Sequence, residues 1–121
     1  MKALLSIKPE FVEKIIKGEK KIEYRRKIFK KDVKSVIIYA TSPWKKIIGE
    51  FYIEEILADE PKNLWAKTSK FSGVEKRFFM NYFKDTKIGY GIKIGKLKLY
   101  KEKNNITKLI KVPPQSYVYI R

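Results

Sequence analysis

The stretch KIGYGIKIGKLKLYK, residues 87–101, carries the pattern that decides the fold. In its first half every second residue is apolar: Ile88, Tyr90, Ile92 and Ile94. Side chains two residues apart share a face of a β-strand, so this half predicts a strand with one buried face. After Gly95 the apolar positions move by one residue, to Leu97 and Leu99. A shift of one residue at a glycine predicts a β-bulge, and bulges bend long strands around small barrels.

Periodicity on both sides of this stretch predicts the other elements. Strands are expected at 2–8, 20–26, 33–41, 45–57 and 112–121, and helices at 9–17, 59–71 and 74–83. This order contains many strands and few crossovers. It favours an α+β fold built on a small, mostly antiparallel β-barrel, with a helix after the first strand and two helices in the middle. A doubly wound parallel sheet fits the order less well.

Single residues mark the ends of these elements. Pro9 suits the first turn of a helix, and Gly18 suits the position just after its last residue. Ser72 and Glu75 have the spacing of a capping box, which predicts that Ser72 caps the third helix. Gly49 predicts a bulge or a close approach of two backbones within the strand at 45–57.

The chain is long enough for one compact core. It has 121 residues, of which 44% are apolar, so residues 1–121 are expected to form a single domain, with a monomer as the default. The apolar runs, such as VIIYA, are much shorter than the roughly 20 residues that span a bilayer. The N-terminus lacks the pattern of a secretory signal, so a cytoplasmic protein without a membrane partner is expected.

The sequence contains neither cysteine nor histidine. This excludes disulfides, thiolate nucleophiles, zinc sites made of cysteine and histidine, and every catalytic arrangement that uses histidine. Catalysis would have to use Lys, Glu, Asp, Ser, Thr or Tyr. No clustered acidic motif indicates a metal site, so neither a metal nor a cofactor is expected.

The net charge is strongly positive. The 29 lysines and arginines exceed the 13 aspartates and glutamates by 16. Such a charge attracts polyanions, and nucleic acid is the leading class of partner. The alternative is that a surface rich in lysine is typical of thermophilic proteins, in which charge contributes to stability and the partner is another protein.

The segment GEKKIEYRR, residues 18–26, concentrates charge beside two apolar residues. On a strand, Glu23 and Arg25 share a face, whereas Lys20 has the opposite parity and joins them only if it lies in the turn after Gly18. One interpretation is a site built from these three side chains. The other is a solvated face over a core, because clusters of surface charge are common and weakly coupled.

Two further residues stand out. Glu50 is a lone acid in an apolar run; if its face turns inward, its carboxylate needs a cationic partner, and a basic residue of segment 18–26 is a candidate. If it faces outward, it is an ordinary surface glutamate. Trp44 lies in a predicted turn before two lysines and is a candidate for stacking on a base. Most other aromatic residues have the spacing of core residues.

The order of several motifs resembles the ASCH domain family, a branch of the PUA-like superfamily. The signature of that family, G-x-K-x-x-E-x-R, reads here as Gly18, Lys20, Glu23 and Arg25. The surrounding SIKP, VIIYATSP, GEF, GYGIKIG and PPQSY also resemble its single-domain archaeal and bacterial members. The resemblance implies a PUA-like β-barrel whose cleft beside the signature receives RNA or a nucleobase, as in a regulator of transcription or translation.

The basic charge and the motif, together with this resemblance, lead to expected roles for individual residues. Binding of RNA or a nucleoside is expected to involve Lys8, Lys20, Glu23, Arg25, Arg26, Ser42, Trp44 and Gln115. The alternative is a hydrolase that acts on an N4-acetylcytidine-type nucleoside or on RNA, with Lys20, Glu23 and Glu50 as catalytic residues. The deacylating branch has a threonine at the position of Glu23, and a carboxylate does not replace a hydroxyl nucleophile.

Overall fold

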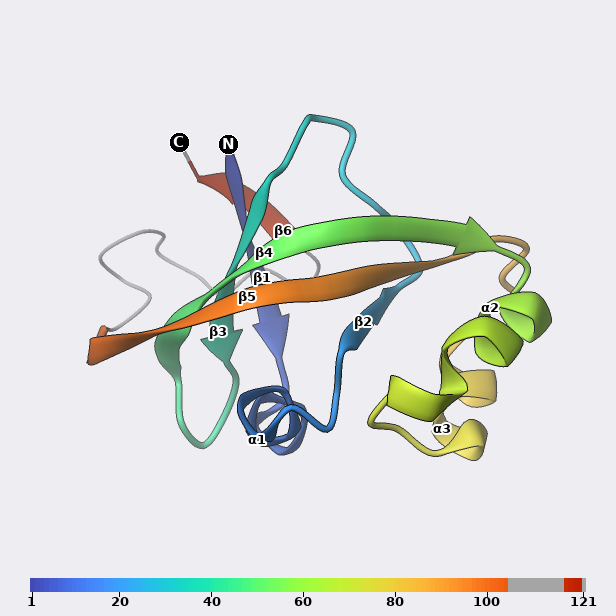
Figure 1. The fold of residues 1–121 in the computed structure, drawn as a ribbon, viewed down its shortest axis with the longest axis horizontal. Helices are drawn as coiled ribbons and strands as arrows, with labels where there is room; N and C mark the ends of the chain where they lie inside the picture. The colour runs from blue at the N-terminus through green and yellow to red at the C-terminus, as the bar shows by residue number, and fades with distance from the viewer. Residues whose placement is uncertain (105–116, 121) are drawn as a thin grey trace.

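The computed structural model describes residues 1–104 and 117–120 (Figure 1). Its elements, in chain order, are β1 (Lys2–Ile7), α1 (Pro9–Lys17), β2 (Ile22–Arg25), β3 (Ser35–Ala40), β4 (Lys46–Asp59), α2 (Pro61–Thr68), a short 3-10 helix (Ser69–Phe71), α3 (Lys76–Tyr82), β5 (Gly89–Asn104) and β6 (Tyr117–Ile120). The predicted order of strands and helices is confirmed. No helix in this part of the chain is both long and apolar enough to cross a membrane.

The six strands form one curled, mixed sheet in the order β2-β5-β4-β3-β1-β6. Strands β1 and β3 are parallel, while the other neighbouring pairs are antiparallel. This confirms the predicted α+β class with a mostly antiparallel, barrel-like sheet. Figure 1 shows β4 and β5 as a long ribbon, with α2 and α3 together at one end of it.

The predicted bulges are present. Phe51 pairs with Leu97 and Ile53 pairs with Ile94, so one more residue of β5 than of β4 lies between these pairs, next to Gly95. Gly49 lies beside another irregularity, and a Cβ atom there would collide with the carbonyl oxygen of Lys98. Bulges increase the local bend and twist of a strand, which explains how two long strands follow a curled sheet.

Both faces of the sheet are buried over its centre. Helix α1 places Val12 and Ile15 against one face, in a cluster that contains Val36, Phe51 and Ile92. The opposite face carries a smaller cluster of Leu4, Ile37, Tyr39 and Ile47. This explains the continuous apolar run of β3, because a strand covered on both sides has no polar face.

A third cluster joins the helices to the end of the sheet. It contains residues of β2, α2 and α3 and the residue just after α3, namely Ile22, Tyr24, Leu64, Phe79 and Phe83. The predicted capping box is wrong, because the N-cap of α3 is Glu75, three residues after Ser72. The backbone turns at Gly73, with φ of +67°, and the Ser72 hydroxyl instead bonds with Ser69 and Val74 inside the turn.

Candidate functional site

The turn after α1 determines where Lys20 lies. Gly18 adopts a left-handed conformation with φ of 79°, which glycine tolerates because it lacks a Cβ atom. The amides of Glu19 and Lys20 both donate to the carbonyl oxygen of Lys14. Lys20 therefore lies in the turn before β2, so the alternation of side chains along a strand does not determine its direction. Its side chain points toward Glu23.

Three charged side chains of the motif form two buried ion pairs that share Glu23. The Lys20 Nζ lies 3.7 Å from Glu23 Oε1, and Arg25 Nη2 lies 3.3 Å from Glu23 Oε2. Their side chains are 2%, 10% and 12% exposed, respectively. Arg25 also donates to the carbonyl oxygen of Ser6 over 3.0 Å. This arrangement contradicts the solvated face, because a solvated glutamate would not be buried between two cations.

The loop before α3 contacts the Lys20 end of this set of charged side chains. Lys20 Nζ donates to the carbonyl oxygen of Ser72 over 3.0 Å, and Lys14 Nζ donates to that of Gly73 over 2.9 Å. A Cβ atom on Gly73 would lie 2.5 Å from the Cβ atom of Lys20, so this position requires glycine for space as well as for its positive φ. The loop therefore fixes the direction of the Lys20 side chain.

The motif opens into a pocket of about 320 Å³, which we call the motif pocket. This lies at the small end of the range of about 300–1,000 Å³ that is typical of ligand sites. Its lining comes from β1, α1, β2 and α3: Ser6, Ile7, Lys8, Phe11, Glu23, Tyr24, Arg25, Phe78, Asn81 and Tyr82. Within the described part of the chain, the Arg25 Nε is buried and has no hydrogen-bond acceptor.

Aromatic rings and cations alternate around the motif pocket. The rings of Phe78 and Tyr82 are nearly parallel, at 5°, with centroids 6.3 Å apart. The Lys8 Nζ lies 5.6 Å from the centroid of Phe78, and the Arg26 guanidinium carbon lies 4.9 Å from that of Tyr82. Flat rings beside cations suit ligands that are both planar and anionic.

Burial changes the proton affinity of several groups at the site. It lowers the pKa of Lys20, and the neighbouring Glu23 carboxylate raises that pKa only in part. Repulsion from Lys14 and Arg25 contributes less than burial does. Burial also raises the pKa of Tyr24 and Tyr82, which keeps both phenols protonated around neutral pH.

A pH dependence of stability follows for Lys20. Its pKa in the folded state lies below the value of 10.5 that it has when unfolded, so between the two values the unfolded state binds more protons. The free energy of unfolding of the wild type is therefore expected to rise with pH in that window, relative to a Lys20→Met variant. Urea unfolding of both proteins from about pH 7 to about pH 10 measures the difference. A difference that is constant across this range would contradict the expectation.

Not all predicted residues meet at this site. Lys8, Glu23 and Arg25 line the motif pocket, Arg26 lies over its Tyr82, and Lys20 lies behind Glu23 without lining it. Three others lie elsewhere: Trp44 lines a separate hollow, Ser42 is exposed in the same turn, and Glu50 pairs with Lys2 at 2.6 Å. Gln115 lies outside the described residues.

The separation of Glu50 from the motif has a simple cause. Glu23 is paired with Ile92, which belongs to the cluster under α1, whereas Glu50 is paired with Ile37 of the cluster on the other face. Paired residues share a face, so the two carboxylates lie on opposite faces of the sheet. Of the two alternatives for Glu50, the one with a cationic partner holds, but that partner is Lys2 and not a residue of segment 18–26.

Sequence analysis missed the contribution of α3. Phe78, Asn81 and Tyr82 form one wall of the motif pocket, but the spacing of Phe78 and Tyr82 indicated core positions. The signal available in the sequence was the polar Asn81 beside aromatic residues. The exposure of these side chains could be known only from the structure. Phe78 is 39% exposed. Across residues 1–104 and 117–120, no group of three or more acidic residues is placed to hold a metal ion.

Comparison with known proteins gives one family. A family model described as ASCH domain matches residues 5–115. A curated ASCH domain-containing ribonuclease from Zymomonas mobilis is 34% identical over 85 residues, which cover 69% of this chain and 57% of that protein. The match thus spans little more than half of that relative's length.

Two solved structures have a fold similar to that of this chain. The crystal structure of ASCH from Zymomonas mobilis superposes with a TM-score of 0.89 at 28% identity, covering 99% of this chain and 87% of that chain. The N-terminal domain of McrB from Staphylothermus marinus has a TM-score of 0.56 at 12% identity, covering 99% of this chain and 88% of that chain. At that identity, the second likeness concerns the fold alone.

Proposed function

This chain belongs to the ASCH domain family, and from its site we propose that it binds RNA through the motif pocket, as a regulator of transcription or translation. One observation carries the proposal: a buried glutamate and arginine, 3.3 Å apart, open into a pocket walled by parallel aromatic rings. A planar, anionic ligand meets all of these groups at once, and a nucleotide in a single strand is such a ligand.

Each group has a separate part in this binding. A base lies against Phe78 or Tyr82, because aromatic rings stack on any base. The guanidinium of Arg25, which lines the motif pocket, donates to a phosphate oxygen or to the acceptor edge of a base. Glu23 orients that guanidinium and accepts from an exocyclic amine such as that of cytosine.

The remaining charges position the ligand. Lys8 and Arg26 lie over rings at the mouth of the motif pocket, where they contact phosphates on either side of the bound nucleotide. Lys20 is 2% exposed and does not reach the ligand; it orients Glu23 instead. The net charge of +16 adds a long-range attraction that is independent of sequence.

Hydrolysis of RNA or of an acylated nucleoside is the second candidate. The name of the Zymomonas mobilis relative, a ribonuclease, favours it, as does a buried lysine with a lowered pKa beside a carboxylate. Such an enzyme would have Lys20 and Glu23 at its centre but not Glu50, which lies on the other face of the sheet. Glu23 would then be the base that lines the motif pocket, with Lys20 behind it.

The first test measures binding. An Arg25→Ala variant is expected to bind a labelled single-stranded RNA about 10- to 100-fold more weakly, because it loses charge-assisted hydrogen bonds. The slope of log affinity against log salt should fall by about 0.7 for each phosphate contact that is lost. Arg25→Lys keeps the charge but loses the planar fork, so it should recover little of the affinity. Fluorescence anisotropy at several salt concentrations measures both quantities.

The same samples decide between the two candidates. Lys62→Ala, an exposed cation at the start of α2, is the control and should bind like the wild type. Equal affinity of wild type and Arg25→Ala would count against the motif pocket as the binding site. The RNA is then separated by length, and N4-acetylcytidine is incubated in parallel. Turnover that a Glu23→Gln variant abolishes would favour the hydrolase, whereas binding with both substrates intact favours the regulator.

A further inference from the structure

A second polar hollow lies away from the motif pocket. Its volume is about 250 Å³, and it is lined by Lys2, Ser35, Glu50, Tyr52, Lys96 and Lys98. We call it the lysine hollow. These residues come from four neighbouring strands of the sheet, β1, β3, β4 and β5, so a rigid part of the fold holds them together.

The register of the sheet explains why these residues meet. Lys2 is paired with Ser35, and Ser35 is paired with Tyr52. One row further along, Glu50 is paired with Lys98. Paired residues project from the same face, so the bulge next to Gly95 and the regular pairs bring these side chains to one side of β4 and β5.

Positive charge dominates the lysine hollow. Its single carboxylate, Glu50, is 17% exposed and is paired with Lys2 at 2.6 Å. Lys96 and Lys98 are exposed, and no carboxylate in the described part of the chain forms an ion pair with either of them. Two amines are therefore unneutralised beside a third, which is the charge pattern that phosphate groups prefer.

A large aromatic ring is exposed at the same place. Tyr52 is 61% exposed, the highest value among the exposed large apolar side chains of the described residues. Leu99, at 44%, follows Lys98 on the same strand. A flat, solvent-exposed ring between lysines is suited to stacking on a base.

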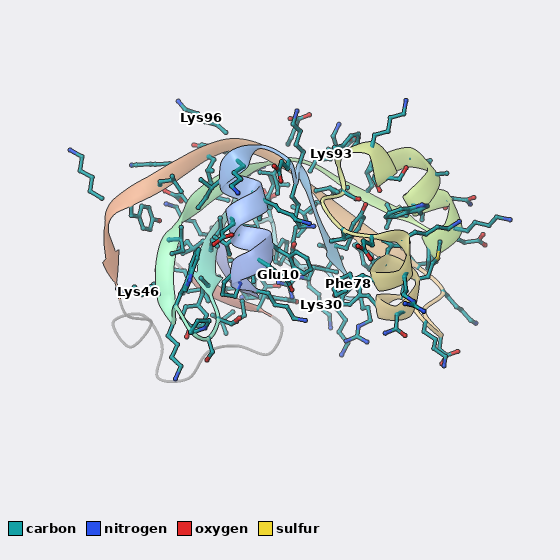
Figure 2. The ribbon with its side chains drawn as sticks, turned by 90° about the horizontal axis from the view of Figure 1, so that it is seen from below. Glu10, Lys30, Lys46, Phe78, Lys93 and Lys96 are labelled. Atoms are coloured by element: carbon teal, nitrogen blue, oxygen red, sulfur yellow. The ribbon has the colours of Figure 1, made fainter. Side chains whose placement is uncertain are left out.

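The lysine hollow is distinct from the motif pocket. Lys2 begins β1 and Lys8 follows its end, so a rise of about 3.3 Å per residue places the two sites about 20 Å apart. Figure 2 shows Lys96 extending into solvent from β5, well apart from Phe78 of the motif pocket. A ligand that reaches both must be a polymer.

We propose that the lysine hollow is a second contact surface for a single-stranded nucleic acid. In this surface Lys96 and Lys98 bind phosphates and Tyr52 stacks on a base. The Glu50–Lys2 ion pair forms the bottom of the hollow and holds its two side chains in place. The inference rests on the proposed function, because it assigns a second part of the same bound strand. It predicts that affinity depends on strand length, since a short strand in the motif pocket cannot extend to the lysine hollow.

Matched variants test the surface. Lys96→Glu/Lys98→Glu and Lys62→Glu/Lys70→Glu change the net charge equally, and all four lysines are exposed. With a 20-nucleotide single strand, the first pair should weaken binding at least about fivefold more than the second. With a dinucleotide, which is too short to reach both sites, the two double variants should bind alike. Tyr52→Ala should weaken binding of the long strand about fivefold or more, and Tyr52→Phe, which keeps the ring, should not.

The outcomes separate this inference from the proposed function. Equal losses for the two double variants on the long strand would overturn the lysine hollow as a nucleic-acid surface, as would be found if it bound an acidic protein instead. In that case, Arg25→Ala would still weaken binding. If the wild type bound neither strand, both proposals would fall. Thermal unfolding of each variant checks that it is folded, because the substituted side chains are exposed.

Discussion

A Glu23→Ala variant is expected to lose about 3–5 kcal/mol of its free energy of unfolding, because the substitution leaves a buried cation without its partner. Lys20 is 2% exposed, and its Nζ lies 3.7 Å from the carboxylate that would be removed. The only other polar contact of that amine in the described structure is the carbonyl oxygen of Ser72. Denaturant unfolding at neutral pH measures the loss.

Two variants control this experiment. Glu54→Ala removes a glutamate that is 59% exposed and paired with Lys93, so its loss should be no more than about 1 kcal/mol. The double variant Lys20→Met/Glu23→Leu removes the Lys20–Glu23 pair and should recover the part of the stability that the buried Lys20 charge costs, although Arg25 still lacks its carboxylate partner. A double variant as unstable as Glu23→Ala would show that the loss arises from packing or from the unpaired Arg25, and not from the buried charge of Lys20.

A Phe79→Ala variant is expected to lose a similar amount, about 3–5 kcal/mol, through a cavity in the core. Phe79 is 1% exposed, and its ring centroid lies 4.7 Å from that of Tyr24 and 4.8 Å from that of Phe83. It joins α3 to β2, so its loss should also loosen the wall of the motif pocket and weaken RNA binding. Calorimetry and anisotropy measure the two effects.

The neighbouring ring provides the control. Phe78 is 39% exposed and lines the motif pocket, so Phe78→Ala should cost no more than about 1 kcal/mol of stability. Its RNA affinity should nevertheless fall about five- to 100-fold, which is typical of a lost stacking ring. The expectation fails if Phe78→Ala destabilises the protein as strongly as Phe79→Ala does, since the two rings would then share one structural role.

Much of the fold could be predicted from local patterns. The ends of α1 follow from Pro9 and Gly18, and the bend of β5 follows from the shift of apolar residues at Gly95. These features depend on residues that are close in sequence. The start of α3 could not be predicted in this way, because Ser72 has the right spacing for a cap but is held in the preceding turn by Gly73.

The site was less predictable for a physical reason. Sequence parity relates Glu23 to Arg25, but the acceptor that directs Lys20 is the carbonyl oxygen of Ser72, 52 residues away. The aromatic wall of the motif pocket likewise depends on how α3 packs on β2. The face on which Glu50 lies depends on its pairing with Ile37 of β3, and its ion pair depends on Lys2 of β1. Neither partner can be identified from the sequence of β4 alone.

The pairing of β2 also sets the order of events during synthesis. The strand that carries the motif is paired with residues 90–93 of β5, so nearly seventy residues separate the two partners in sequence. Bringing such distant segments together is slow, and β2, which carries Glu23 and Arg25, has no neighbouring strand in the described sheet until β5 has left the ribosome. Fragments that end before β5 would therefore be unable to engage their ligand, however complete their signature is.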